Sequence, residues 1–88
     1  MYRVIVYPEA AQQIAELPLQ LLGDYAHALD AAAAAPWDGA PHHKDNPDAE
    51  VRRGLFGPLG AGQLLYLVLE REQEIHVLQV LWLELPED

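Results

Sequence analysis

The sequence predicts a single α+β domain, residues 1–88, in which a hairpin of two helices packs on an antiparallel four-stranded sheet. Its 88 residues are enough for one hydrophobic core. A β-branched and aromatic segment opens the chain, two segments of helical periodicity follow, and three strand-like segments end it. Because the helices precede a run of strands and do not alternate with them, this β-α-α-β-β-β order favours α+β layers over a doubly wound sheet.

The first part of the chain is predicted to form one strand and two helices. Residues 2–7 are β-branched and aromatic and stop at a proline, which indicates a strand. That proline suits the first turn of a helix over residues 9–17, where apolar residues recur three and four apart. Pro18 interrupts this helix and can begin a second one, whose apolar stripe over residues 22–33 has the 3.6-residue period and ends before Pro36.

The second part is predicted to form three strands. Residues 37–48 are polar without either period and indicate a loop. Residues 51–56 form a strand, and a glycine-rich turn separates it from the next strand, residues 63–69. The apolar residues of 63–69 do not alternate with polar ones, so we expect a central strand covered on both faces. A charged reversal precedes the last strand, residues 75–83.

The composition limits the possible chemistry. Fourteen acidic residues outnumber five basic ones, which gives a net charge of -9. The chain contains no cysteine, serine or threonine, and this excludes hydroxyl and thiolate nucleophiles of those types, disulfides and cysteine zinc sites. Nucleic-acid binding is disfavoured, because its affinity grows with the number of phosphates that cations neutralise.

Two further features bear on location. No basic segment followed by an apolar one opens the chain, and cysteine is absent, so we expect a cytoplasmic protein. The longest apolar stretch, residues 55–69, contains three glycines and a proline, which break it well short of a membrane-spanning helix. We therefore expect no membrane partner.

The order of elements and the texture of the strands carry a family resemblance. The chain has an opening strand, a Leu17-Pro18 break after its first helix, and a proline after its second. Arg52 and Arg53 then lie on a strand, and a glycine turn leads into the Leu-Leu-Tyr-Leu-Val strand around Tyr66. Over residues 2–83 the sequence resembles the RelE/ParE superfamily of bacterial toxins.

This resemblance implies the toxin component of a type II toxin-antitoxin pair, with a cognate antitoxin as partner. Family members act as ribosome-dependent mRNA endoribonucleases or inhibit DNA gyrase, so the ribosome with its mRNA, or gyrase, is the implied target. The alternative is a non-toxic, non-enzymatic relative that acts as a protein-binding or dimerising module. Enzymatic activity stays open: RNA-cleaving members carry an arginine just before the tyrosine of the third strand, where this chain has Gln63, and a basic tail, where this chain ends in acids.

The candidate catalytic residues are the cations and imidazoles near the second strand. Cleaving RNA through its own 2′-hydroxyl needs a proton acceptor, a cation for the phosphate and an acid for the leaving oxygen, and no protein nucleophile. Arg52, Arg53, Lys44 and His43 can supply these parts, with His42 as a second imidazole.

Other roles for these residues remain open. Neighbouring residues of a strand point to opposite faces, so one of Arg52 and Arg53 faces the helices, where a structural ion pair with Asp48 or Glu50 competes with a phosphate contact. Histidines and carboxylates within residues 42–50 also suggest a metal site. Because no helix fixes their spacing, we expect a solvated loop, no metal and no cofactor.

The candidate partner-binding residues are apolar. Trp82, with Leu83 and Leu85, is too large to be fully covered at this place in so small a domain, which suggests a protein interface; the alternative is a tryptophan folded back on the second helix. Tyr66 is expected to be a core or interface aromatic. His76 is expected to be a surface histidine. A partner with excess positive charge would suit a surface of -9.

Overall fold

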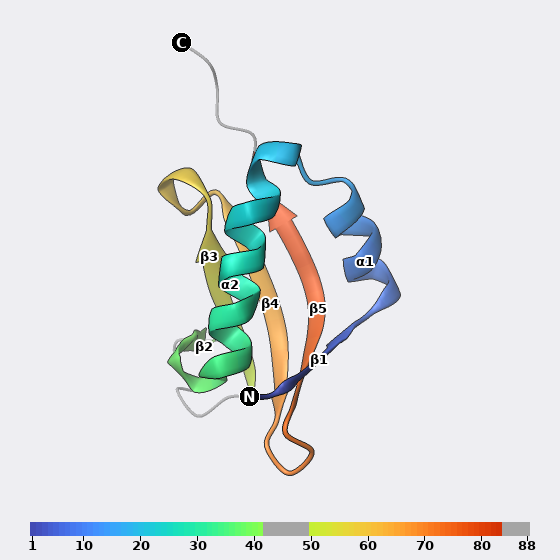
Figure 1. Ribbon diagram of the computed structural model, residues 1–88, viewed down its shortest axis with the longest axis vertical. Coiled ribbons are helices and arrows are strands. Elements are labelled where there is room, and N and C mark those ends of the chain that lie inside the picture. The colour runs from blue at the N-terminus through green and yellow to red at the C-terminus, as the bar shows by residue number, and fades with distance from the viewer. Residues whose placement is uncertain (42–49, 84–88) are drawn as a thin grey trace.

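The computed structural model describes residues 1–41 and 50–83. Five strands form one sheet in the order β1-β5-β4-β3-β2, in which β1 runs parallel to β5 and the other neighbours are antiparallel (Figure 1). The elements are β1 (Arg3–Val6), α1 (Pro8–Ala15), α2 (Leu22–Ala34), β2 (Ala40–Pro41), β3 (Val51–Phe56), β4 (Gly62–Leu69) and β5 (Glu74–Trp82), with 3₁₀ turns at Leu19–Leu21, Pro36–Asp38 and Pro58–Gly60.

The α+β class and the two helices packed on a sheet are confirmed, but the predicted sheet of four antiparallel strands is wrong in two respects. A two-residue strand, β2, lies inside the predicted loop and pairs with the middle of β3. The opening strand pairs in parallel with the last strand of the chain, from Arg3 opposite Glu74 to Val6 opposite Val77. Local periodicity indicates which residues form strands, whereas the direction of a pair so distant in sequence depends on the whole fold.

The predicted break between the helices is confirmed. Pro8 is at the start of α1, where a missing N–H costs no helical hydrogen bond. After Pro18 a 3₁₀ turn leads directly into α2. Because β1 pairs with β5 only as far as Val77, the end of β5 has an open edge, and α1 lies along it. There the side-chain carbonyl of Gln13 accepts a hydrogen bond from the backbone N–H of Val80 at 2.7 Å.

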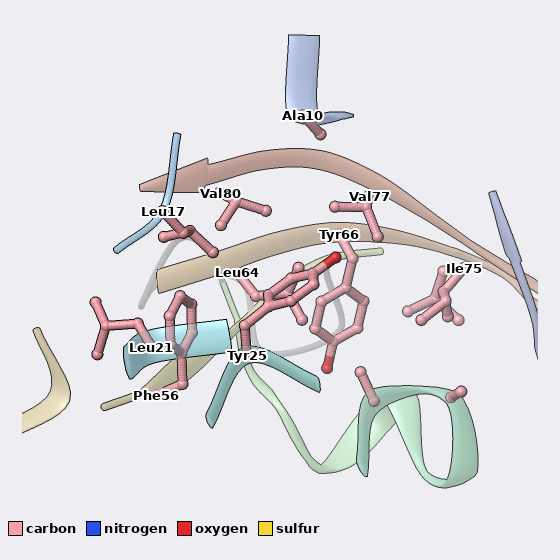
Figure 2. Packing of buried hydrophobic residues seen from close by; sticks show 13 residues of the cluster. Ala10, Leu17, Leu21, Tyr25, Phe56, Leu64, Tyr66, Ile75, Val77 and Val80 are labelled. Carbon is pink, nitrogen blue, oxygen red and sulfur yellow. The ribbon is translucent and has the colours of Figure 1, made fainter. Parts of the chain in front are cut away.

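The core lies between α2 and one face of the sheet (Figure 2). Tyr25 of α2 meets Phe56 of β3 edge to face, with ring centroids 5.8 Å apart. Gly62 lies opposite Phe56, where an added Cβ would come within 2.3 Å of the ring, so this position requires glycine. The largest fully buried side chains are Tyr66, Leu64, Ile75, Val68, Val77 and Val80.

The prediction that β4 is central is confirmed and none of its residues is exposed, but in the described part of the chain a helix covers only one of its faces. The strand is central, between β5 and β3, but α2 packs on only one of its faces. Leu65, Leu67 and Leu69 alternate with the core residues and point to the other face. The leucines that obscured the alternation therefore lie on a sheet surface that no described helix covers. No helix in the described ranges is long and apolar enough to cross a bilayer.

Candidate functional site: the open face of the sheet

We call the side of β3, β4 and β5 that is turned away from α2 the open face. Antiparallel register places its side chains in rows that cross the three strands. The first row, near the end of β5, is Leu55, Gln63 and Leu81, the second is Arg53, Leu65 and Gln79, and the third is Val51, Leu67 and His76.

The first row is apolar and exposed. Leu55 is 62% exposed and Leu81 is 45% exposed, and Leu83 beyond them is 73% exposed. These three leucines border a hollow of about 210 Å³, whose other lining residues include Trp82 and Gln63. The backbone N–H of Leu83 donates to the carbonyl of Ala61 at 3.0 Å, which fixes the rim of the hollow. Adjacent apolar side chains of this kind indicate an interaction surface.

The two arginines of β3 have different surroundings, because they point to opposite faces. Arg52 faces α2 and is 8% exposed. Its Nη1 donates to the carbonyl of Gly39 at 3.0 Å, and its guanidinium lies 5.0 Å from the centre of the Trp37 ring. Arg53 is half-buried on the open face, in the row with Leu65 and Gln79. The structure therefore leaves Arg53 as the β3 cation that can meet a partner or a phosphate.

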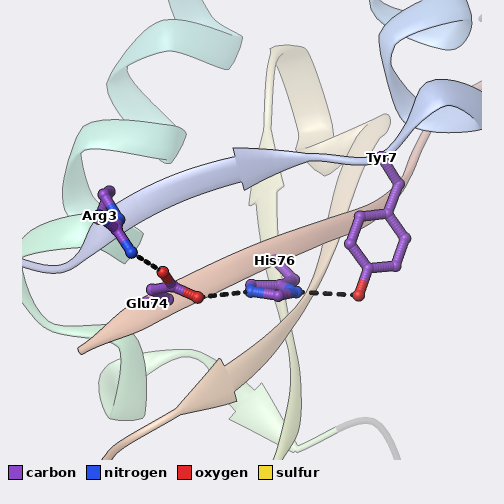
Figure 3. A network of polar contacts seen from close by, with 4 residues as sticks. All are labelled: Arg3, Tyr7, Glu74 and His76. Atoms are coloured by element: carbon purple, nitrogen blue, oxygen red, sulfur yellow. Dashed lines mark hydrogen bonds and ion pairs between the residues drawn. The ribbon is translucent and has the colours of Figure 1, made fainter. Parts of the chain in front are cut away.

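A polar network joins β1 to β5 beside the open face (Figure 3). Glu74 forms an ion pair with Arg3 and accepts a hydrogen bond from Nε2 of His76 at 2.9 Å. The hydroxyl of Tyr7 lies 2.8 Å from Nδ1 of His76 and donates to it when the imidazole is neutral. The carboxylate thus fixes the orientation of His76, and Tyr7 closes the far side of the ring.

This network fixes the orientation of His76 and Glu74, but it does not by itself form a phosphate-cleaving site. His76 can accept a proton through Tyr7, whereas the cation of the network, Arg3, lies four residues from Tyr7 on an extended segment and is bound to Glu74. The carboxylate of Glu74 offsets the charge of Arg3 that a phosphodiester would need. The expectation that His76 is a plain surface histidine needs correction, because its side chain is 17% exposed and bonded on both nitrogens.

The network predicts a dependence of stability on pH. The hydrogen bond from His76, followed by the one from Arg3, lowers the pKa of Glu74 below its ordinary value of 4.5. A carboxyl group with a lowered folded pKa stabilises the fold above its unfolded pKa, and this contribution is lost as the pH falls through the folded value. We expect Glu74→Gln to flatten the loss of stability below pH 4.5, as measured by urea unfolding at a series of pH values.

Glu72→Gln is the matched control, because Glu72 is exposed in the turn between β4 and β5. The control should lose stability on acidification as the wild type does. Identical acid profiles for Glu74→Gln and the wild type would contradict the role given to Glu74.

The other predicted site residues differ in their surroundings, and some of them lie outside the described residues. Lys44, His43 and Leu85 lie outside the described residues. Tyr66 is 1% exposed and its hydroxyl donates to the carbonyl of Pro36 at 2.7 Å, so it is a core aromatic and offers no surface to a partner. Trp82 is half-buried, packs against the core and lines the hollow. No cluster able to hold a metal ion occurs among the described residues, which do not include residues 42–49.

Comparison with known proteins identifies the fold. No family model and no curated protein match this sequence. A chain of the intact Escherichia coli RelBE toxin-antitoxin complex superposes with a TM-score of 0.77 at 14% identity, covering 96% of this chain and 99% of that one. The isolated E. coli RelE toxin gives 0.77 at 13% identity, with 99% and 89% covered. The RelBE2 toxin-antitoxin complex of Mycobacterium tuberculosis gives 0.70 at 21% identity, with 90% and 94% covered. The chain therefore has the fold of the RelE toxins, as its resemblance to the RelE/ParE superfamily implied.

Proposed function

We propose that this protein is the toxin component of a RelE-like toxin-antitoxin pair, and that it binds its cognate antitoxin through the open face in the cytoplasm. Of the three solved structures compared above, two are toxin-antitoxin complexes and one is the RelE toxin alone. The likeness extends over nearly the full length of both chains, so the proposal concerns the whole domain and not a shared fragment.

The observation that carries the proposal is the exposed leucine cluster on the open face of a RelE-like sheet. Leu55, Leu81 and Leu83 keep 62%, 45% and 73% of their surface exposed after folding, whereas complete burial of an exposed leucine side chain is favourable by about 1.5–3 kcal/mol. A partner that covers them gains the part of this free energy that belongs to the surface still exposed. The same surface contains Arg53, so one face presents both apolar area and a charge.

The geometry bears on the two activities of the family. RNA cleavage needs cations at the phosphate, and Arg52 is engaged by Gly39 and Trp37 on the other side of the sheet. Inhibition of gyrase needs no catalytic set and depends only on binding. Between these activities we favour one that depends on binding, with ribosome-dependent cleavage through Arg53 as the second candidate.

Expression in a bacterial host tests the proposal. We expect induction of the wild type to arrest growth, and coexpression of the antitoxin encoded by a neighbouring reading frame to restore growth and to copurify with the toxin. Arg53→Ala should weaken both arrest and copurification, because it removes the β3 cation of the open face. Cleavage of a reporter mRNA and supercoiling of a plasmid then distinguish the two activities.

Arg71→Ala is the matched control, since Arg71 has the same charge and is exposed in the turn between β4 and β5. Its arrest should equal that of the wild type. If the wild type neither arrests growth nor binds a neighbouring gene product, the alternative of a non-toxic binding or dimerising module replaces the proposal.

A further inference from the structure

We infer that Tyr7 is a nucleophile for activated acyl donors: His76 takes the proton of its hydroxyl, and Glu74 positions the imidazole for this step. The donor is a carboxylic ester or thioester with a good leaving group. The inference concerns the chemistry of one side chain, and it does not rest on the proposed function.

The composition leaves tyrosine as the source of hydroxyl nucleophiles in this chain. Serine, threonine and cysteine are absent, and the four tyrosines are Tyr2, Tyr7, Tyr25 and Tyr66. Tyr25 and Tyr66 are buried. Tyr2 is half-buried, and its hydroxyl donates to the carboxylate of Glu70. Tyr7 is 37% exposed, so an electrophile can reach this side chain from solvent.

The hydrogen bonds around His76 determine which of its nitrogens can act as a base (Figure 3). Nε2 lies 2.9 Å from a carboxylate oxygen of Glu74, which can only accept, so the neutral ring carries its proton on Nε2. Nδ1 therefore offers its lone pair, and it lies 2.8 Å from the hydroxyl oxygen of Tyr7. The phenol donates to Nδ1, and through this contact the proton can leave the oxygen as it attacks.

The pairing of β1 with β5 holds these groups together. The backbone N–H of Tyr7 donates to the carbonyl of Val77 at 3.1 Å, next to His76 in the chain. The rings of Tyr7 and His76 meet edge to face, with centroids 5.4 Å apart. Arg3 holds the second oxygen of the Glu74 carboxylate. A hydroxyl, a base and an orienting carboxylate are thus connected in series, which is the arrangement that activates weak nucleophiles.

The proposed step is an acyl transfer without oxidation or reduction. The hydroxyl oxygen of Tyr7 attacks the carbonyl carbon of the donor, an O–C bond forms, and the hydroxyl proton moves to Nδ1 of His76. The bond from the carbonyl carbon to the leaving group then breaks, and the leaving group departs with the bonding electrons and takes the proton from His76. Glu74 stabilises the imidazolium between the two proton transfers. The products are O-acyl-Tyr7 and a free alcohol or thiol.

Tyr2 provides a comparison within the same protein. Its hydroxyl also lies beside a base, 2.6 Å and 2.8 Å from the two carboxylate oxygens of Glu70. Hydrogen bonds from Tyr2, then Trp37 and Gln73, lower the pKa of this carboxyl group, so it is a weaker proton acceptor than an imidazole. The hydrogen bond to Glu70 also raises the pKa of the Tyr2 hydroxyl. We therefore expect Tyr2 to be much less reactive than Tyr7.

Acyl donors suit this site better than phosphoryl donors. A phosphoryl donor carries negative charge at the reacting group and needs cations to hold it. The cation of the network is Arg3, and the carboxylate of Glu74 offsets its charge. A carboxylic ester is uncharged at its reacting carbon, so the net charge of -9 does not repel it. Ile5, which is 36% exposed between Arg3 and Tyr7 on the same face of β1, adds apolar surface for the acyl group.

Acetylation by p-nitrophenyl acetate tests the nucleophile in the full chain. The release of p-nitrophenolate is followed by absorbance, and the acetylated residue is identified by mass spectrometry of peptides. We expect a stoichiometric burst with the acetyl group on Tyr7, which Tyr7→Phe abolishes and Tyr2→Phe retains. A burst of equal size from Tyr7→Phe, or acetylation of Tyr2 or of the amines of Met1 and Lys44 at the rate of Tyr7, would overturn the inference.

Removal of the imidazole tests the base. We expect His76→Ala to slow the acetylation of Tyr7 by roughly a hundredfold, because the hydroxyl loses its proton acceptor. Added imidazole should restore much of the rate, which a purely structural role of His76 would not allow. An unchanged rate in His76→Ala, or a slow variant that imidazole does not rescue, would refute the role of His76 as the base.

The positioning role of Glu74 is tested by the ring nitrogen NMR shifts of His76. The wild type should carry the ring proton on Nε2, whereas Glu74→Gln should give a mixture of both tautomers, because an amide can accept or donate, and slower acetylation. A ring proton on Nδ1 in the wild type, or an unchanged tautomer and rate in Glu74→Gln, would contradict this role.

Acetyl phosphate tests the class of donor, because one molecule offers a carbonyl carbon and a phosphorus atom to the same nucleophile. We expect the mass of the Tyr7 peptide to increase by an acetyl group and not by a phosphoryl group. Phosphorylated Tyr7 would overturn the assignment to acyl donors.

Discussion

Replacement of Tyr66 by alanine is expected to lower the free energy of unfolding by about 3–5 kcal/mol, the cost of removing a large aromatic side chain from a packed core. Tyr66 is 1% exposed in the central strand of the sheet, opposite Arg52 on one side and Val77 on the other. Urea unfolding followed by far-ultraviolet circular dichroism measures the change. For a domain of this size such a loss approaches the whole stability, so a largely unfolded variant is also consistent with the expectation.

The phenylalanine variant separates packing from hydrogen bonding at the same position. Burial raises the pKa of Tyr66, so its hydroxyl stays protonated and donates to the carbonyl of Pro36. Tyr66→Phe keeps the ring but leaves that carbonyl without this donor, and we expect a loss of about 1–3 kcal/mol. Full stability of Tyr66→Phe would show that the hydroxyl contributes nothing, and a mild effect of Tyr66→Ala would contradict the core position itself.

The elements that local chemistry determines were predictable from the sequence. The strand over Val51–Phe56 has the predicted bounds, and Pro8 and Pro18 begin and separate the helical segments as their missing N–H groups require. Elements that depend on distant partners were not predictable. β2 exists because Ala40 and Pro41 meet Arg53 and Arg52 across the sheet, and β1 is parallel because it pairs with the far end of the chain.

The candidate site also combines features that local spacing predicts with contacts between residues that are distant in sequence. Alternation predicted that one arginine of β3 faces the helices, but the sequence did not say which. Phe56 answers this question: it lies in the core, and Arg52, four residues before it on the same strand, points to the same face. The run of leucines in β4 was interpreted as burial on both faces; on the open face Leu65 is buried, whereas Leu67 and Leu69 are half-buried. Glu74 and His76 share a face by their spacing of two, but Tyr7 lies 69 residues from His76 in sequence.

The role of Arg52 yields the second large effect. We expect Arg52→Ala to lower the free energy of unfolding by about 2–4 kcal/mol, because it removes a charged hydrogen bond to the carbonyl of Gly39 and a cation–π contact with Trp37. Arg52→Lys should recover only part of this loss, since an ammonium group lacks the planar stacking surface. The measurement is again urea unfolding.

Arg53→Ala is the internal control for Arg52→Ala, because it removes the same side chain from the neighbouring position on the open face. We expect its stability to stay within about 0.5 kcal/mol of the wild type while antitoxin binding falls. A combined substitution of both arginines would mix these effects, since loss of growth arrest would then follow from unfolding alone. Equal stability of the two single variants would contradict the structural role of Arg52, and loss of stability in Arg53→Ala would place its guanidinium in the fold and not in the interface.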